Sequence, residues 1–250
     1  MRGKFTRSHG RRAYLRWGGQ RAEVALVILH GWQLFAQVYE RLGEILSEEN
    51  FVVIPDLPGF GESEPISKVD FEAFAIEVRR QLTAFGITKA QVVGHSMGGA
   101  VALHLAIKYP DMVEQVFLFG SAGVPPKRSQ LGWVIAGIKN WFYNLKSGGT
   151  AQPLTNGIRA VCYALRRPLW SYFSFRRTTC CNLLVNLHEV KVPITVIWGR
   201  HDLFFPSPDE LCQSLGVNPT YRQNGQGHDS IFMFPEESAQ LIREHLIRQE

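Results

Sequence analysis

The stretch that decides the fold is AQVVGHSMGG, residues 90–99, which leads into the largely apolar residues 100–109. A short β-branched run enters G-x-S-x-G, and helical spacing follows, so the pattern predicts a strand, a sharp turn and a helix. The backbone of such a turn passes close to its neighbours, which requires glycine at Gly94 and Gly98. The turn would expose Ser96 as a nucleophile beside the free amides of a helix N-terminus.

A serine nucleophile needs a base, and the base needs an orienting acid. In this architecture the three follow in the order Ser, Asp or Glu, His. His228 lies on a Gly-rich loop after the last strand candidate, and Asp202 follows the run 194–198. Both fall at the same sheet edge as Ser96, so the order predicts a Ser96, Asp202, His228 triad. The alternative acids are Asp56, Asp209, Glu210 and Asp229.

The oxyanion that forms during acyl transfer needs two converging backbone donors. One candidate is the amide of Met97, directly after the nucleophile. The other is the amide of Trp32, in the loop after the run 24–29, where Gly31 permits a tight turn. The predicted substrate pocket is lined by His30, Gly31, Gln33, His95, Val124, Trp133, Leu203 and Phe204.

Short apolar runs alternate with helix-period stretches along the chain, which is typical of an α/β protein with a parallel sheet. Strands are expected at residues 4–8, 13–17, 24–29, 51–55, 90–94, 113–119, 194–198 and 220–224. Helices are expected at residues 37–47, 70–85, 98–109, 207–215 and 235–248, with Asp70 as an N-cap.

Residues 123–186 break this alternation. Apolar residues repeat at three and four from Leu131 to Leu145, Gly148-Gly149 ends that helix, and a second helix is expected from about 156 to 166. A helical insertion between the sixth and seventh strands predicts a lid over the carboxyl edge of the sheet, where ligands bind. The expected division is a core of residues 1–122 and 187–250, and a cap of residues 123–186.

The net charge of +5 is unevenly distributed along the 250 residues. Residues 115–188 hold nine Lys or Arg and no Asp or Glu, whereas the remainder holds 18 basic and 22 acidic residues. Aromatic side chains interleave with the nine cations. The aromatics could simply pack the lid while the cations reach water, or the surface could meet an anionic carrier, an anionic membrane or small anionic substrates. Nucleic acid is not an expected partner, because the remainder is net negative.

Composition excludes several classes of protein. Hydrophobic residues make up 45% of the chain, enough for a sizeable core, and no apolar run approaches the roughly 20 residues of a membrane span. Four cysteines without metal-ligand spacing suggest free thiols in a reducing compartment, so a cytoplasmic location is expected. We expect neither a metal nor an organic cofactor.

The motifs together resemble the α/β-hydrolase superfamily, in particular its lidded serine hydrolases of carboxylesterase and lipase type. The resemblance rests on LHG at 29–31, DLPGFGES at 56–63, GHSMGG at 94–99, WGRHD at 198–202 and GH at 227–228. It implies an eight-stranded, mostly parallel sheet. Epoxide hydrolases and haloalkane dehalogenases have Asp at the nucleophile position, where this chain has Ser96. Meta-cleavage C–C hydrolases usually carry Trp shortly after the base, where this chain has DSIF at 229–232.

The expected function is hydrolysis of a small-molecule acyl ester by a Ser-His-Asp acyl-enzyme mechanism, with thioesters or lactones as further substrates. One alternative is a C–C bond hydrolase or cofactor-free haloperoxidase that uses the same triad. The alternative of another class is a non-catalytic receptor that binds a ligand under the lid.

Overall fold

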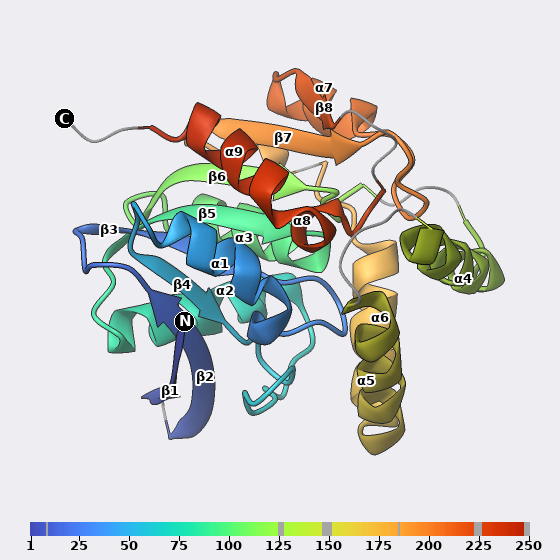
Figure 1. Ribbon diagram of the computed structural model, residues 1–250, viewed down its shortest axis with the longest axis horizontal. Coiled ribbons are helices and arrows are strands. Elements are labelled where there is room, and N and C mark those ends of the chain that lie inside the picture. Colours follow the sequence, from blue (N-terminus) through green and yellow to red (C-terminus); the bar gives the residue numbers. More distant parts are fainter. Residues whose placement is uncertain (9, 125–127, 147–151, 185, 223–226, 248–250) are drawn as a thin grey trace.

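The computed structural model describes residues 1–8, 10–124, 128–146, 152–184, 186–222 and 227–247. Within them, eight strands form one sheet in the order β1-β2-β4-β3-β5-β6-β7-β8 (Figure 1). Strands β3 to β8 run parallel, while β2 pairs antiparallel with β1 and β4, so the predicted mostly parallel sheet is confirmed. The strands are β1 Arg2–Ser8, β2 Arg11–Gly18, β3 Val24–Leu29, β4 Val52–Pro55, β5 Lys89–His95, β6 Val113–Phe119, β7 Ile194–Gly199 and β8 Pro219–Arg222.

Helices cover both faces of this sheet. One hydrophobic cluster joins the sheet to α2, α3 and α7, and a second joins it to α1, α8 and α9. The flanking helices are α1 Glu40–Leu46, α2 Phe71–Ala84, α3 Met97–Lys108, α7 Asp209–Leu215, α8 Ser230–Met233 and α9 Pro235–His245, with 3₁₀ turns at Ala36–Tyr39 and Leu187–Glu189. The Asp70 carboxylate accepts a 2.7 Å hydrogen bond from the Ala73 amide, which confirms the predicted N-cap of α2.

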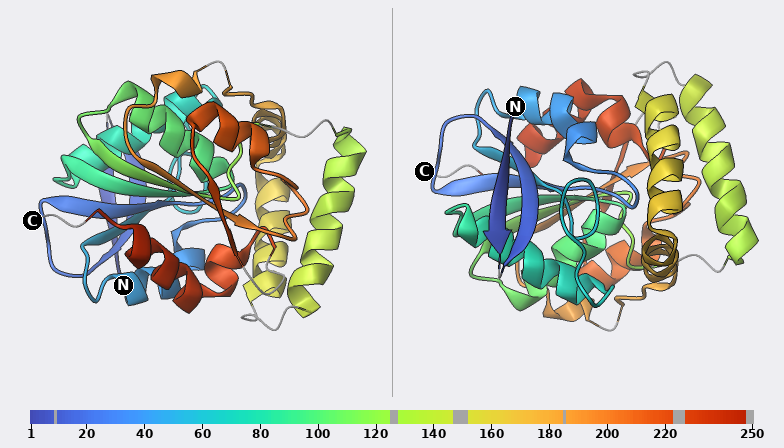
Figure 2. Two further views of the ribbon diagram at one scale, coloured as in Figure 1. Left: turned by 90° about the horizontal axis from the view of Figure 1, so that it is seen from above. Right: turned by 90° about the horizontal axis from the view of Figure 1, so that it is seen from below.

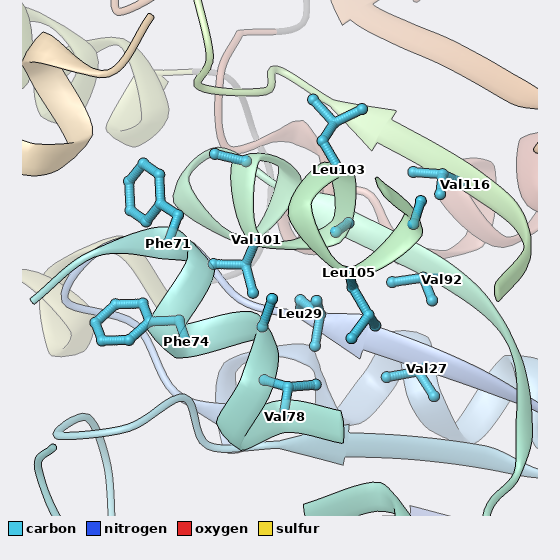
Figure 3. Packing of buried hydrophobic residues seen from close by; sticks show 14 of the residues in the cluster. Val27, Leu29, Phe71, Phe74, Val78, Val92, Val101, Leu103, Leu105 and Val116 are labelled. Carbon is cyan, nitrogen blue, oxygen red and sulfur yellow. The ribbon is translucent and has the colours of Figure 1, made fainter. Parts of the chain in front are cut away.

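The first cluster fixes the turn that carries Ser96. Val27 of β3 and Val92 of β5 lie beside Leu105 of α3, Val101 lies one turn earlier on that helix, and Val78 of α2 belongs to the same cluster (Figure 3). All five side chains are fully buried. Strand β5 and helix α3 are therefore held rigidly on either side of their connection.

In the described part of the segment between β6 and β7, three α-helices occur: α4 Gln130–Lys146, α5 Gln152–Arg166 and α6 Pro168–Cys180. They stand beyond the carboxyl ends of the strands, and we call them the cap (Figures 1 and 2). Helix α6 was not predicted as a separate helix, because its apolar residues show no clear helical stripe. The predicted helix end at Gly148-Gly149 lies outside the described residues. Within the described residues, no helix is both long enough and apolar enough to span a bilayer.

Candidate active site

Ser96 occupies a strained turn between β5 and α3. Its backbone φ of 52° and ψ of −118° lie in a region that residues other than glycine rarely adopt. A Cβ on Gly94 would overlap Gly99, and one on Gly98 would collide with the carbonyl oxygen of Leu29. Glycine is therefore required at both positions, for the reason that the sequence predicts.

Asp202 and His228 lie against each other in loops that follow β7 and β8. His228 Nδ1 lies 2.7 Å from Asp202 Oδ2, and both side chains are buried. The amides of Phe204 and Phe205 each donate a 2.8 Å hydrogen bond to Asp202 Oδ1. Because the Asp202 carboxylate can only accept a hydrogen bond, we assign the proton of His228 to Nδ1, and Nε2 is then the basic nitrogen.

Burial of His228 by itself lowers the pKa of its imidazole. The charge of Asp202 and its hydrogen bond act in the opposite direction and outweigh burial, so the net shift raises the pKa above 6.5. The carboxylate therefore stabilises the imidazolium that forms when His228 takes a proton.

A second histidine, His95, hydrogen-bonds to the backbone of the loop that carries His228. His95 Nε2 lies 3.1 Å from the carbonyl oxygen of His228, and His95 Nδ1 lies 2.6 Å from the hydroxyl of Tyr39. The carbonyl can only accept, so His95 donates from Nε2 and accepts from Tyr39. The Tyr39 oxygen in turn accepts a 3.1 Å hydrogen bond from the Gly31 amide. This relay connects the loop after β3 to the backbone of His228, and no sequence motif pointed to Tyr39.

The loop after β3 lies directly against the nucleophile. A Cβ on Gly31 would lie 3.3 Å from the Cβ of Ser96. Gln33 has a φ of 59°, one of two positive values at non-glycine residues in the described part of the chain. The Trp32 indole donates to Ser174 at 2.9 Å, and the Gln33 amide donates to Ser171 at 3.0 Å. Helix α6 of the cap therefore anchors the loop that carries one of the two predicted oxyanion donors.

A cavity of about 520 Å³ opens between this edge of the sheet and the cap. Ser96 and His228 both line it, together with Trp32 and the predicted pocket residues Gly31, Gln33, His95, Trp133 and Phe204. Most of the remaining wall is apolar and comes from the cap and the loop after β7. The structure thus brings the predicted nucleophile and base to one apolar cavity.

Three residues predicted to line the pocket do not line this cavity. His30 is fully buried beneath the loop, where its Nε2 accepts a 2.9 Å hydrogen bond from the Leu57 amide. Burial lowers the pKa of His30 to about 4, which keeps its ring neutral. Val124 instead packs against the hydrophobic cluster below, and the carbonyl oxygen of Leu203 accepts a hydrogen bond from Arg128. Met97 is buried in the first turn of α3 and contributes no side chain to the wall.

The alternative acids have other positions. Asp56 is buried and accepts hydrogen bonds from the amides of Ala36 and Glu62, and burial raises its pKa to about 6. Asp209 and Glu210 lie exposed on α7. Asp229 follows His228, and its Oδ2 accepts hydrogen bonds from Asn140 and Asn144 of α4 at 2.7 and 2.6 Å. Asp202 alone of these candidates contacts the imidazole of His228 in the described structure.

One group of potential metal ligands occurs among the described residues, formed by His95, His228 and Asp229 within 4.8 Å of one another. Both nitrogens of His95 already bond to protein atoms, and Nδ1 of His228 bonds to Asp202. Two asparagine amides hold one oxygen of Asp229. These contacts explain the cluster as a hydrogen-bond network rather than as a cation site.

Comparison with known proteins agrees with this architecture. A family profile described as "alpha/beta hydrolase fold" matches residues 24–146. A soluble epoxide hydrolase of Corynebacterium sp. (strain C12) is 37% identical over 94 residues, which cover 37% of this chain and 33% of that protein. The 2-hydroxy-6-oxo-6-phenylhexa-2,4-dienoate hydrolase of Burkholderia cepacia is 28% identical over 211 residues, which cover 73% of this chain and 72% of that protein. The crystal structure of a membrane phospholipase A matches with a TM-score of 0.82 at 23% identity and covers 97% of this chain and 84% of that one.

A parallel sheet with a strained serine turn at its carboxyl edge is the architecture of the α/β hydrolases. The chain has the α/β-hydrolase fold, as its motifs predicted, and the family profile matches just under half of its length. The names of the three similar proteins refer to different substrates. Similarity alone therefore assigns no substrate to this chain.

Proposed function

We propose that this protein hydrolyses carboxylic esters through an acyl-enzyme on Ser96. His228 takes the proton of the Ser96 hydroxyl, and Asp202 keeps the imidazole oriented and stabilises its charge. The amides of Trp32 and Met97 bind the oxyanion of the tetrahedral intermediate. His228 then protonates the leaving alcohol and activates the water that releases the acid.

The observation that carries this proposal is the position of Ser96. It lies in a strained turn and lines the same cavity as a histidine bound to a buried carboxylate. A protein that only binds a ligand has no need of these three groups together, so their arrangement favours catalysis over a receptor. Ser96 also stands where epoxide hydrolases have their aspartate, which disfavours epoxide opening.

The wall of the cavity supports an acyl substrate of low polarity. It is formed mainly by aromatic and aliphatic side chains, such as Trp133, Trp141 and Phe175, with neutral hydroxyl and amide groups between them. The single carboxylate among the described lining residues, Asp229, would repel a second carboxylate on a substrate. Uncharged acyl chains of esters, and by extension of thioesters and lactones, fit this lining.

A C–C bond hydrolase is the second candidate. It is supported by the relative from Burkholderia cepacia, which aligns over 73% of this chain. The C–C reaction is less well supported than ester hydrolysis, because its product carries carboxylates. The apolar wall of the cavity would not stabilise these charges. The same three residues would serve both reactions, so substrate preference separates them.

The test is hydrolysis of p-nitrophenyl esters from acetate to palmitate at about pH 8, which is above the ordinary pKa of a histidine. Removal of Ser96 in Ser96→Ala should lower turnover roughly 10⁴- to 10⁶-fold, because the acyl-enzyme can no longer form. Ser121→Ala is a matched control, since Ser121 is also buried near the end of a strand and bonds only to the Ala122 carbonyl in the described structure. Folded wild-type protein that cleaves a dienoate C–C bond but no ester would contradict the proposal.

A further inference from the structure

The cap exposes an unusual amount of apolar surface. Eleven of the thirteen large hydrophobic side chains that are exposed in the described part of the chain belong to it. Single exposed apolar residues are ordinary, but a concentration of this kind marks an interaction site. The eleven are Leu131, Val134, Ile135, Ile138, Phe142, Ile158, Val161, Leu165, Leu169, Tyr172 and Phe173.

Helix α4 carries the most regular part of this surface. Four of its residues are spaced by four, three and four positions and are 42% to 67% exposed: Leu131, Ile135, Ile138 and Phe142. We call them the α4 stripe. The buried residues of the same helix are Trp133, Ala136, Asn140 and Asn144. At 3.6 residues per turn the two sets lie about half a turn apart. The α4 stripe therefore faces away from the protein.

The place of α4 in the molecule leaves this face open. Both views of Figure 2 show α4 at the outer margin, farther from the sheet than the other two cap helices. A helix of this length, with its apolar side turned outward, can lie flat on a plane. That geometry is typical of amphipathic helices that rest in a membrane interface.

Charge around the α4 stripe favours an anionic partner. Lys139 lies four residues from Ile135 and three from Phe142, and Lys146 lies one turn beyond Phe142. Both lysines are exposed. Arg176 of α6 is exposed as well, and residues 115–188 contain no acid.

The same surface surrounds the candidate active site. Val134 of α4 and Tyr172 of α6 line the cavity, yet they are 52% and 53% exposed. Trp141, which also lines the cavity, lies on α4 between its buried face and the stripe. The mouth of the cavity therefore borders the apolar face of the cap.

From these observations we infer that the cap docks on the surface of an anionic lipid bilayer, with the α4 stripe buried in the interface and Lys139 and Lys146 against the headgroups. Docking brings the cavity mouth to the lipid, so a ligand partitioned in the bilayer reaches it without crossing water. The inference concerns the binding surface and does not depend on which bond Ser96 attacks.

Two other occupants fit less well. A second copy of the chain would present the same excess of positive charge, so apposed caps would repel each other. An acidic protein would satisfy the lysines and arginines, but a protein surface depleted of apolar residues would leave the α4 stripe only partly covered. A lipid interface offers both negative headgroups and an apolar layer.

The experiment measures partition of the full chain onto vesicles of equal parts phosphatidylcholine and phosphatidylglycerol, by flotation. Ile135→Ser with Ile138→Ser should weaken binding about tenfold or more, because two side chains no longer enter the apolar layer. Lys139→Gln with Lys146→Gln should weaken it about thirtyfold at low salt and reduce its salt dependence. Vesicles of phosphatidylcholine alone should bind the wild type much more weakly.

Matched controls lie at the opposite edge of the sheet. Ile247 is 45% exposed, and Lys191 is an exposed lysine just before β7. Ile247→Ser and Lys191→Gln should bind vesicles like the wild type, and circular dichroism should show that every variant is folded. Wild type that fails to bind, or binding unchanged in both cap variants, overturns the inference. So does a dimer in sedimentation that the isoleucine variant abolishes while vesicle binding persists.

Discussion

Asp202 uses both carboxylate oxygens to hold its neighbours. One accepts two backbone amides of its own loop, and the other accepts the Nδ1 proton of His228. The loop therefore fixes the carboxylate, and the carboxylate fixes the ring. This arrangement predicts how activity depends on pH.

Hydrolysis should fall at low pH, because only a neutral His228 can take the serine proton. The net effect of Asp202 raises the pKa of His228 above 6.5, so the acidic limb of kcat/KM should have its midpoint above that value. Asp202→Asn removes the carboxylate charge but leaves His228 buried, so the midpoint of the acidic limb should shift to lower pH. The same variant should lower the rate by about 10⁴. The measurement is the pH profile of both proteins, and an unshifted midpoint in the variant would show that Asp202 does not act on His228.

Gly120, just after β6, tests the same contact without changing a charged group. It has a φ of 49°, and a Cβ there would lie 2.9 Å from both Asp202 Oδ2 and His228 Nδ1. Gly120→Ala should push the pair apart and lower kcat more than tenfold. Gly216→Ala is the matched control, because its φ is 68° and no atom lies within 4 Å of the added methyl.

Backbone strain should cost both glycine variants a similar amount of stability, about 1 kcal/mol, and the close contact of the new methyl costs Gly120→Ala more. Only Gly120→Ala should lose activity in addition. Equal activity of the two folded variants would contradict the role of the Asp202–His228 contact.

The residues that a motif or its chain order marks could be predicted, as for Ser96, Asp202 and His228. Their supports could not. Tyr39 meets His95 across 56 positions of the chain, and Trp32 meets Ser174 across 142. Such partners are set by how elements pack, and a lone tyrosine or serine in a helix carries no signal of its own.

Helix α4 shows three different faces to its surroundings. One is buried against the core loops, one lines the cavity through Gly137 and Trp141, and one is the exposed α4 stripe. Its amphipathic period was visible in the sequence. The sequence could not show that the stripe faces outward, because a stripe usually faces a core.

Gly137→Leu should narrow the cavity while leaving the fold intact. A Cβ at Gly137 would meet Phe204 at an ordinary 3.7 Å, and replacing a helix-interior glycine adds up to about 1 kcal/mol of stability. The longer leucine then fills space in the cavity, so activity on long acyl esters should fall more than activity on acetate. The ratio of the two kcat/KM values, measured beside Gly137→Ala, checks this, and an unchanged ratio would place the acyl chain elsewhere.

The elements with strong patterns were predicted nearly to the residue, and β3 and β6 have the expected bounds. Helices α6 and α8 were missed for different reasons. Apolar and polar residues are mixed around α6, and α8 is a single turn of four residues that no periodic pattern can reveal.

At the scale of the molecule, polar contacts join the cap to the core around the cavity. Ser171 and Ser174 of α6 accept from Gln33 and Trp32, while Asn140 and Asn144 of α4 donate to Asp229. In each of these hydrogen bonds the core residue is itself a proposed catalytic residue or lies next to one in the chain. The position of the cap is therefore coupled to the geometry of the site. The charge and composition of residues 115–188 indicated a separate segment but could not predict this coupling.

Removal of two of these contacts should impair catalysis at a distance. Ser171→Ala with Ser174→Ala removes the two side-chain hydrogen bonds between the Trp32 loop and α6, so the oxyanion donor is less well positioned and kcat should fall about tenfold or more. A matched control is Ser214→Ala, which removes an exposed helical hydroxyl bonded to the Glu210 carbonyl. A rise in KM at unchanged kcat would indicate that the serines only hold the cavity wall.

The central claim is that Ser96 is an activated nucleophile. A fluorophosphonate reacts with such a serine and forms one covalent adduct, which mass spectrometry of the digested protein locates. The account predicts a single adduct on the peptide that contains Ser96, much slower labelling of Asp202→Asn, and none of Ser96→Ala. Folded wild-type protein that stays unlabelled, or that is labelled at another serine, would contradict it.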